Sequence, residues 1–95
     1  MRKADLINAI VQRMDIDKIK AEQAVELWMH LVKQSLSMNE NVYLRGFGSF
    51  IVKKRATKTA RNISKNTALV VPEHYIPAFK PAPGFKKKVK ENVKP

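Results

Sequence analysis

The sequence predicts an α+β fold in which a helical part comes first and antiparallel strands follow. Apolar residues recur every three or four positions as far as residue 38, whereas from residue 42 onward they alternate or form short runs. The charge divides at the same place, because residues 1–40 are electrically neutral and residues 41–95 carry the whole formal net charge of +11. A chain of 95 residues has room for one small domain, so a single domain is expected.

Two amphipathic helices are expected in the first part of the chain. Apolar residues at helical spacing predict the first helix over residues 5–14. Asp17 suits the N-cap of a second helix over residues 18–38, because its side-chain oxygen can accept a backbone N–H of the first turn. The apolar stripe of this second helix is too broad for one neighbour to cover, so it is expected to have two surfaces to bury.

A hairpin and a long strand follow the helices. Residues 42–44 and 50–52 have strand character, and Gly46-Phe47-Gly48 between them predicts a tight turn. Nothing from there to residue 61 has a helical pattern or a further glycine. The second strand is therefore expected to run to residue 61 without interruption.

This strand is expected to turn back and form a basic arm over residues 53–75. Residues 62–66 have the composition of a loop tip, and residues 67–71 that of a returning strand. Residues 41–72 contain no carboxylate. Six lysines and arginines lie on the arm, which is more than the protection of an exposed strand edge requires, so they favour contact with phosphates.

The chain is expected to end in a strand and a short helix. Residues 75–79 resume apolar strand character, and prolines follow them closely. Residues 83–93 predict a helix with Phe85 and Val89 facing inward and most of its lysines facing outward. The sheet and its arm then cover residues 42–80.

The charge favours a polyanionic partner, and the composition excludes several kinds of site. A basic excess on one part of a small chain is typical of nucleic-acid binding. Without cysteine, and with His30 and His74 far apart in the sequence, no disulfide, metal site, cofactor or catalytic set is expected, and hence no enzymatic activity. No apolar run reaches the roughly 18 residues of a transmembrane helix and no secretory leader is present, so we expect an intracellular, cytoplasmic protein without membrane contact.

The aromatic residues indicate a core that two chains share. If the arm extends into solvent, about 70 residues remain for a core, which is marginal for independent folding. This remainder nevertheless carries many large apolar side chains, and a symmetric dimer would bury them. The residues assigned to the core or dimer interface are Trp28, Leu31, Phe47, Phe50 and Phe79.

Four segments of the chain match a known family. They are KADLINAI at residues 3–10, RGFGSF at residues 45–50, RNISKN at residues 61–66 and YIPAFKP at residues 75–81. Over nearly its whole length the chain resembles the bacterial HU and integration host factor family of nucleoid proteins, and the HU type most. The motifs are specific, because two apolar-aromatic motifs flank an Arg-Asn arm tip at matching separations.

The resemblance implies an intertwined homodimer with a helical base, a small antiparallel sheet and one extended β-ribbon arm per subunit. Residues 1–38 would be the helical dimerisation part, residues 42–80 the sheet with its arm, and residues 83–93 the C-terminal helix. Members of the family grip the minor groove of double-stranded DNA with the arms, bend and condense it with little sequence preference, and open a base step with an apolar residue at the arm tip.

The resemblance also implies where DNA is bound. At the arm tip this chain has Ile63 where the family usually has proline, and a stiff β-branched side chain is expected to intercalate as well. A structural turn is the alternative role for Arg45 and Gly46, and simple solvation is the alternative for the body lysines. The expected DNA-binding residues are Arg45, Gly46, Lys53, Arg55, Lys58, Arg61, Asn62, Ile63, Lys65, Lys3, Lys80 and Lys86.

Several alternatives stay open from the sequence. Within the family, an integration host factor subunit that binds specific sites is the main one, and a heterodimer with a related chain is another. Outside it, an RNA-binding or ribosome-associated basic protein would share the charge excess. The preferred DNA, whether linear, bent, nicked or branched at a junction, is also left open.

Overall fold

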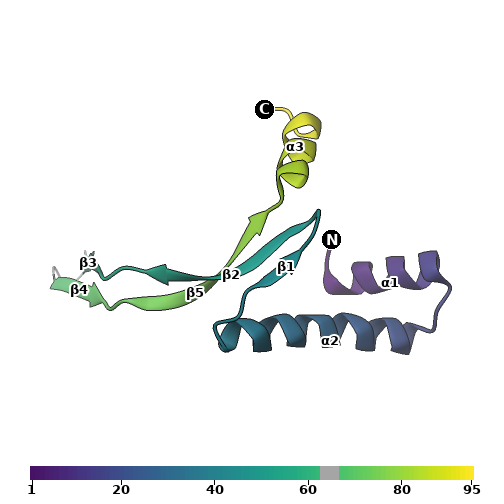
Figure 1. The fold of residues 1–95 in the computed structure, drawn as a ribbon, viewed down its shortest axis with the longest axis horizontal. Helices are drawn as coiled ribbons and strands as arrows, with labels where there is room; N and C mark the ends of the chain where they lie inside the picture. Colours follow the sequence, from purple (N-terminus) through teal and green to yellow (C-terminus); the bar gives the residue numbers. More distant parts are fainter. Residues whose placement is uncertain (63–66) are drawn as a thin grey trace. The chain divides into compact units, whose positions relative to one another are not determined.

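The computed structural model describes the backbone of residues 1–62 and 67–95, and the side chains of residues 1–57 and 70–95. The elements are α1 (Lys3–Met14), α2 (Lys18–Ser37), β1 (Val42–Leu44), β2 (Gly48–Arg55), β3 (Lys58–Asn62), β4 (Thr67–Val71), β5 (His74–Pro81) and α3 (Pro83–Asn92). The strands form a three-stranded antiparallel sheet ordered β1-β2-β5 and a two-stranded ribbon, β3-β4 (Figure 1). The α+β class is confirmed.

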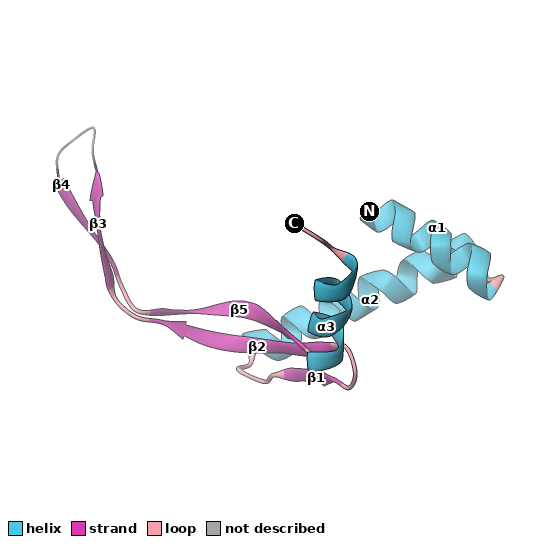
Figure 2. Ribbon diagram, turned by 90° about the horizontal axis from the view of Figure 1, so that it is seen from above, coloured by secondary structure: helices cyan, strands magenta, loops and turns pink. Residues whose placement is uncertain are grey.

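Contacts divide the chain into two compact units, residues 1–35 and residues 36–95. In the first unit, α1 and α2 run antiparallel along each other (Figures 1 and 2). α1 begins two residues earlier than expected, because the Asp5 carboxylate accepts the backbone N–H of Arg2 at 2.8 Å and so caps the first turn from within. Asp5 is therefore the third residue of the helix rather than its start.

The connection between α1 and α2 follows helix-end chemistry. Asp15 takes a left-handed conformation with φ 52°, and its N–H donates to the Val11 carbonyl at 3.0 Å, which ends α1. The carbonyl of Asp17 accepts the N–H of Ala21 at 3.0 Å, so Asp17 occupies the expected N-cap position of α2. α2 ends at Ser37, one residue earlier than predicted, and Asn39 turns the chain at φ 60°.

The core of the first unit covers one flank of α2 and leaves the other flank open. Among the described residues, the buried hydrophobic side chains are Ile7 of α1 and Ala21 and Val25 of α2. Trp28, seven positions after Ala21 and so on the same side of α2, is still 45% exposed. Further round the helix, Leu27 is 56% exposed and Leu31 is 52% exposed. Within one chain the broad apolar stripe of α2 is therefore only partly covered.

The ribbon of the second unit is interrupted where one continuous strand was predicted. Arg55 pairs with His74 at the end of one ladder, and Lys58 pairs with Val71 at the start of the next. Residues 56–57 on one side and residues 72–73 on the other lie outside both ladders, so the two ladders keep the same register. The ribbon changes direction there (Figure 2).

Pro72 explains the interruption. Proline has no backbone N–H to donate to a ladder and fixes its own φ, so it interrupts pairing with the strand opposite. The prediction of an uninterrupted strand to residue 61 was wrong because it considered only the first strand and not its partner. The returning strand over residues 67–71 is confirmed, whereas Asn62, expected in the loop tip, ends β3, and residues 63–66 lie outside the described residues.

An aromatic cluster joins the sheet to α3. The rings of Phe50 and Phe79 are 4.9 Å apart across β2 and β5, and the Phe47 ring lies 5.1 Å from Phe79 and 5.5 Å from Phe85 of α3. Gly48 lets these groups approach, because a Cβ on it would lie 2.6 Å from the Phe79 ring. β5 ends at Pro81, and Pro83 is the first residue of α3.

Candidate nucleic-acid interface

The register of the sheet gives it an apolar face and a polar face. In an antiparallel sheet, paired residues share a face and successive residues alternate. Phe50 pairs with Phe79 on the apolar face. The polar face carries the residues one position away: Tyr43 of β1, Ser49, Ile51, Lys53 and Arg55 of β2, and His74, Ile76, Ala78 and Lys80 of β5.

Three of the predicted DNA-binding residues are thereby brought to one face. Lys53 and Arg55 follow each other along β2, and Lys80 lies opposite Ser49 near the other end of the sheet. All three side chains are exposed. The described residues of the polar face include no carboxylate, so its permanent charges are all positive.

Arg45 and Gly46 lie at the end of this face. Gly46 has φ 82° in the turn between β1 and β2, a conformation that favours glycine. The N–H of Phe47 donates to the Leu44 carbonyl at 3.0 Å and closes the turn. Arg45 and Lys80 line the same surface depression of about 410 Å³, together with Ser49. Arg45 therefore belongs to the turn and also lines a depression that a second basic residue, Lys80, lines.

Lys54 lies on the opposite face, where its charge is matched. Its ammonium nitrogen lies 3.0 Å from Oε1 of Glu73, and both side chains are about half exposed. The pair is diagonal across the ribbon, because Lys54 lies opposite Tyr75 and Glu73 precedes that residue by two. Of the three consecutive basic residues 53–55, the two on the polar face are those without an acidic neighbour there.

The outer arm is described only through its backbone. Lys58 and Arg61 belong to β3, so they occupy the ribbon as predicted, and Asn62 ends the same strand; the side chains of all three lie outside the described part of the chain. Ile63 and Lys65 lie outside the described residues altogether. Their assignments as DNA contacts stay predictions.

The two remaining body lysines lie on helices. The ammonium of Lys3 in α1 forms an ion pair with Glu26 of α2. The hydrogen bond between them raises the pKa of Lys3 above its ordinary value and lowers the pKa of the Glu26 carboxyl. A phosphate bound by Lys3 would compete with this carboxylate. Lys86 is exposed in the first part of α3 and does not line the Arg45 depression.

Sequence reasoning missed three residues of the polar face. Tyr43 is 72% exposed there, and its hydroxyl accepts a hydrogen bond from the Asn41 amide at 3.2 Å. Ser49 lies beside it, and His74 lies opposite Arg55. The alternation of Val42, Tyr43 and Leu44 could have placed Tyr43 on the solvent side, because its neighbours are the apolar pair.

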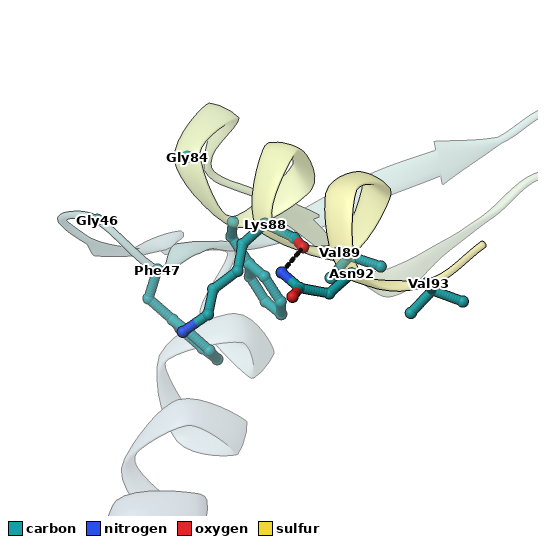
Figure 3. A pocket seen from close by; sticks show the side chains of 8 residues that line it. Gly46, Phe47, Gly84, Lys88, Val89, Asn92 and Val93 are labelled. Atoms are coloured by element: carbon teal, nitrogen blue, oxygen red, sulfur yellow. Dashed lines mark hydrogen bonds between the residues drawn. The ribbon is translucent and has the colours of Figure 1, made fainter.

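The residues assigned to a shared core are only partly covered. Phe47 is 44% exposed and Phe79 is 38% exposed, while Phe50 is less so. Beside them an apolar groove of about 540 Å³ runs between the β1–β2 turn and α3, lined by Phe47, Phe85, Val89 and Val93 among others (Figure 3). Val89, expected to face inward, points to this groove and is 48% exposed. The amide of Asn92 donates to the Lys88 carbonyl at 2.6 Å along its rim (Figure 3).

Residues 1–57 and 70–95 hold no group of three or more metal-ligating side chains. Within the described part of the chain no helix has the length and apolar character needed to cross a membrane.

Comparison with known proteins agrees with this arrangement. The family model described as bacterial DNA-binding protein matches residues 1–90. DNA-binding protein HU of Staphylococcus aureus is 38% identical over 90 residues, which cover 95% of this chain and all of that protein. Integration host factor subunit beta of Saccharophagus degradans is 37% identical over 94 residues, which cover 98% of this chain and 96% of that protein.

A solved structure with the same fold was determined with DNA present. The chain superposes on HU from an Anabaena HU–DNA cocrystal structure with a TM-score of 0.89 and 28% identity, over 95% of this chain and 98% of that one. The four sequence motifs and all the strands lie within the residues that the family model matches. The chain therefore belongs to the bacterial DNA-binding protein family of HU and integration host factor.

Proposed function

We propose that this protein is a non-enzymatic, histone-like protein of the bacterial nucleoid that binds double-stranded DNA as a homodimer and bends it with little sequence preference. One observation carries the proposal: Lys53, Arg55 and Lys80 share an exposed face that has no carboxylate among its described residues. The Anabaena relative, whose chain this one matches over nearly its full length, was crystallised with DNA.

The physical mechanism combines charge and shape. Neutralising backbone phosphates releases condensed counterions, which supplies affinity without sequence preference. The arm residues Lys58, Arg61, Asn62 and Lys65 would follow the minor groove, while Arg45, Gly46 and Lys80 would hold DNA at the body of the sheet. Ile63 would enter a base step at the tip, and the cost of unstacking would be offset by the larger surface that bent DNA wraps.

Gel-shift titrations on linear, nicked and cruciform DNA, with duplex RNA of the same length as competitor, test this function. We expect every DNA to compete better than RNA, because the wide, shallow minor groove of RNA does not fit a narrow ribbon. Affinity should fall steeply with salt. In a plot of the logarithm of the binding constant against the logarithm of the salt concentration, each neutralised phosphate should make the slope more negative by about 0.9. Equal competition by RNA would instead support an RNA-binding protein.

The wedge is tested separately by replacing Ile63. We expect Ile63→Ala to bind DNA with little loss of charge-driven affinity but to bend it less, because a methyl group is too small to hold a base step open. Ile63→Leu is the matched control and should bend DNA like the parent. End-to-end energy transfer on a doubly labelled duplex measures the bend, and equal bending by parent and Ile63→Ala would exclude intercalation by this residue.

A second function is supported by the integration host factor relative, whose identity of 37% is nearly that of the HU relative. A subunit of that kind would recognise particular sites through DNA shape and deformability. Footprinting on a pool of random duplexes separates the two. Uniform partial protection supports the HU-type function, whereas enrichment of one sequence class supports site-specific binding.

A further inference from the structure

We propose that His74 is a further contact to the nucleic acid, one that binds a backbone phosphate in its protonated form. The inference rests on the proposed DNA-binding function and adds a residue that none of the basic motifs includes. His74 is the first residue of β5 and pairs with Arg55, so it belongs to the polar face. Its side chain is exposed.

A hydrogen bond fixes which ring nitrogen is available. Nδ1 of His74 lies 2.9 Å from the carbonyl oxygen of Pro72. A carbonyl can only accept, so Nδ1 carries the hydrogen and donates it. In the neutral ring Nε2 then has only a lone pair, which repels a phosphate oxygen. Protonation converts Nε2 into an N–H donor and adds a positive charge, which is what a phosphate binds.

Two basic residues lie beside His74 on the polar face, so the three could hold one anion together. β2 is the strand that pairs with β5 here, and from it Arg55 faces the imidazole directly while Lys53 lies two residues further along the same face. The neighbouring carboxylate, Glu73, lies on the opposite side of the ribbon, where Lys54 engages it at 3.0 Å. A phosphate held by Arg55 and Lys53 would therefore be the anion that stabilises an imidazolium at this position.

The consequence is proton uptake when DNA binds. Histidine side chains ordinarily gain a proton near pH 6.5, and a bound phosphate favours the protonated ring. Affinity should therefore increase as the pH falls from 7.0 to 5.5. Other side-chain types ordinarily titrate outside this range, so imidazole groups are the ones that a pH change between 7.0 and 5.5 tests.

Fluorescence anisotropy on a labelled random duplex at pH 5.5, 6.0, 6.5 and 7.0, at fixed ionic strength, tests the inference. For the parent we expect affinity to rise about two- to fivefold per chain toward pH 5.5, the range of one exposed ion pair. His74→Gln should lose most of this rise. His30→Gln, which removes the other imidazole from an exposed position on α2, should retain it.

A third variant should bind tightly at every pH instead of losing the gain in affinity. His74→Lys carries a permanent charge, so it should bind at pH 7.0 as tightly as the parent does at pH 5.5 and show little pH dependence. Calorimetry at pH 6.5 in two buffers of different ionisation enthalpy should detect proton uptake by the parent and less by His74→Gln. Circular dichroism at each pH verifies that all variants are folded.

The outcomes separate this inference from the function on which it rests. A parent that fails to bind duplex DNA at pH 7.0 would overturn the DNA-binding function itself. A parent that binds with an affinity independent of pH, or a His74→Gln protein with the parental pH dependence, would overturn only the role of His74. Loss of the pH dependence in His30→Gln would assign the titration to α2 instead.

Discussion

The backbone at Gly48 passes too close to its neighbours for a side chain. A Cβ there would lie 2.6 Å from the Phe79 ring and 2.7 Å from the carbonyl oxygen of Lys80. We expect Gly48→Ala to lower the free energy of unfolding by about 1–3 kcal/mol, the range for an overpacked core, because neither the ring nor the backbone can move without disturbing β5. Denaturant unfolding followed by circular dichroism measures the change.

Gly84 provides the matched control. It lies in α3, and a Cβ there would meet no atom within 4 Å. Gly84→Ala should therefore leave stability unchanged or raise it by about 0.5–1 kcal/mol, because alanine restricts the unfolded chain. If both substitutions had the same effect, the close approach at Gly48 would not be what requires glycine.

The ion pair of Lys3 and Glu26 makes stability depend on pH. The pair lowers the pKa of Glu26, so its stabilisation is present above the pH at which an unfolded glutamate titrates and is lost as the pH falls through the lowered pKa. It also raises the pKa of Lys3, so the same stabilisation is lost again at strongly alkaline pH. Both groups are exposed, and the effect is small.

Thermal unfolding between pH 5 and pH 3 tests this linkage. The parent should lose more stability over this interval than Glu26→Gln does, since the variant has no carboxylate to protonate at that position. Glu22→Gln, one turn earlier on α2, leaves the pair intact and should behave like the parent. Parallel curves for parent and Glu26→Gln would mean that the pair does not contribute in solution.

Single residues show where sequence reasoning succeeds and fails. The N-cap position of Asp17 was predicted correctly, because the start of a helix depends on residues that are neighbours in the sequence. The role of Asp5 was missed, since a carboxylate can precede a helix or cap it from within, and the sequence does not decide between them. His74 was assigned no binding role, because its place beside Arg55 depends on the strand register.

At the scale of elements, the Lys54–Glu73 pair sets the charge of the ribbon base. We expect Glu73→Gln to bind DNA more tightly by up to about fivefold per chain, because it removes a carboxylate and leaves Lys54 without its acidic partner. The slope of affinity against salt should steepen by about 0.9 if Lys54 then neutralises one more phosphate. Anisotropy titrations at three salt concentrations measure both quantities.

Glu91→Gln is the control, because it makes the same charge change on α3. Glu91 lies 4.0 Å from Lys87, so it also has a lysine neighbour. An equal gain in affinity from both variants would assign the effect to net charge rather than to the position of Glu73 on the ribbon.

Elements were predictable where one segment determines its own state. The helices, residues 42–44 and residues 67–71 follow from local periodicity, and all lie within two residues of their predicted positions. The interruption of the ribbon did not follow from the sequence of the first strand, because Pro72 acts on its partner from the opposite strand. The assignment of Lys53 and Lys54 to opposite faces likewise could not be predicted without the strand register.

At the scale of the whole molecule, the exposed apolar flank of α2 predicts a dimer. Leu31→Glu should weaken association by about a hundredfold or more, because it would bury an unpaired charge. His30→Glu is the control, since residue 30 lies nine positions, or two and a half turns, after the buried Ala21 and so on the opposite side of α2. Sedimentation velocity at micromolar concentration measures the mass of each protein. A monomeric parent would contradict the shared core.

Whole-molecule properties were predictable only in part. The charge division indicates a polyanion binder, and the large apolar residues outside the arm indicate a shared core, from the sequence alone. Which apolar surfaces stay uncovered in one chain, such as Phe47 and the groove beside α3, became apparent only once helix and sheet were placed within the second unit. Packing of this kind brings together residues that are far apart in the sequence, and the composition does not predict which ones.

The shared register on the two sides of the ribbon's interruption limits how the arm can change in length. Residues 56–57 of one strand and 72–73 of the other are unpaired between the ladders. Because their number is the same in both strands, the second ladder keeps the register of the first. An insertion in one strand alone would turn every later side chain to the other face, whereas one residue added to each strand would preserve the pairing frame. Relatives with longer or shorter arms should therefore differ by matched changes in both strands, so that total arm length varies in even numbers of residues.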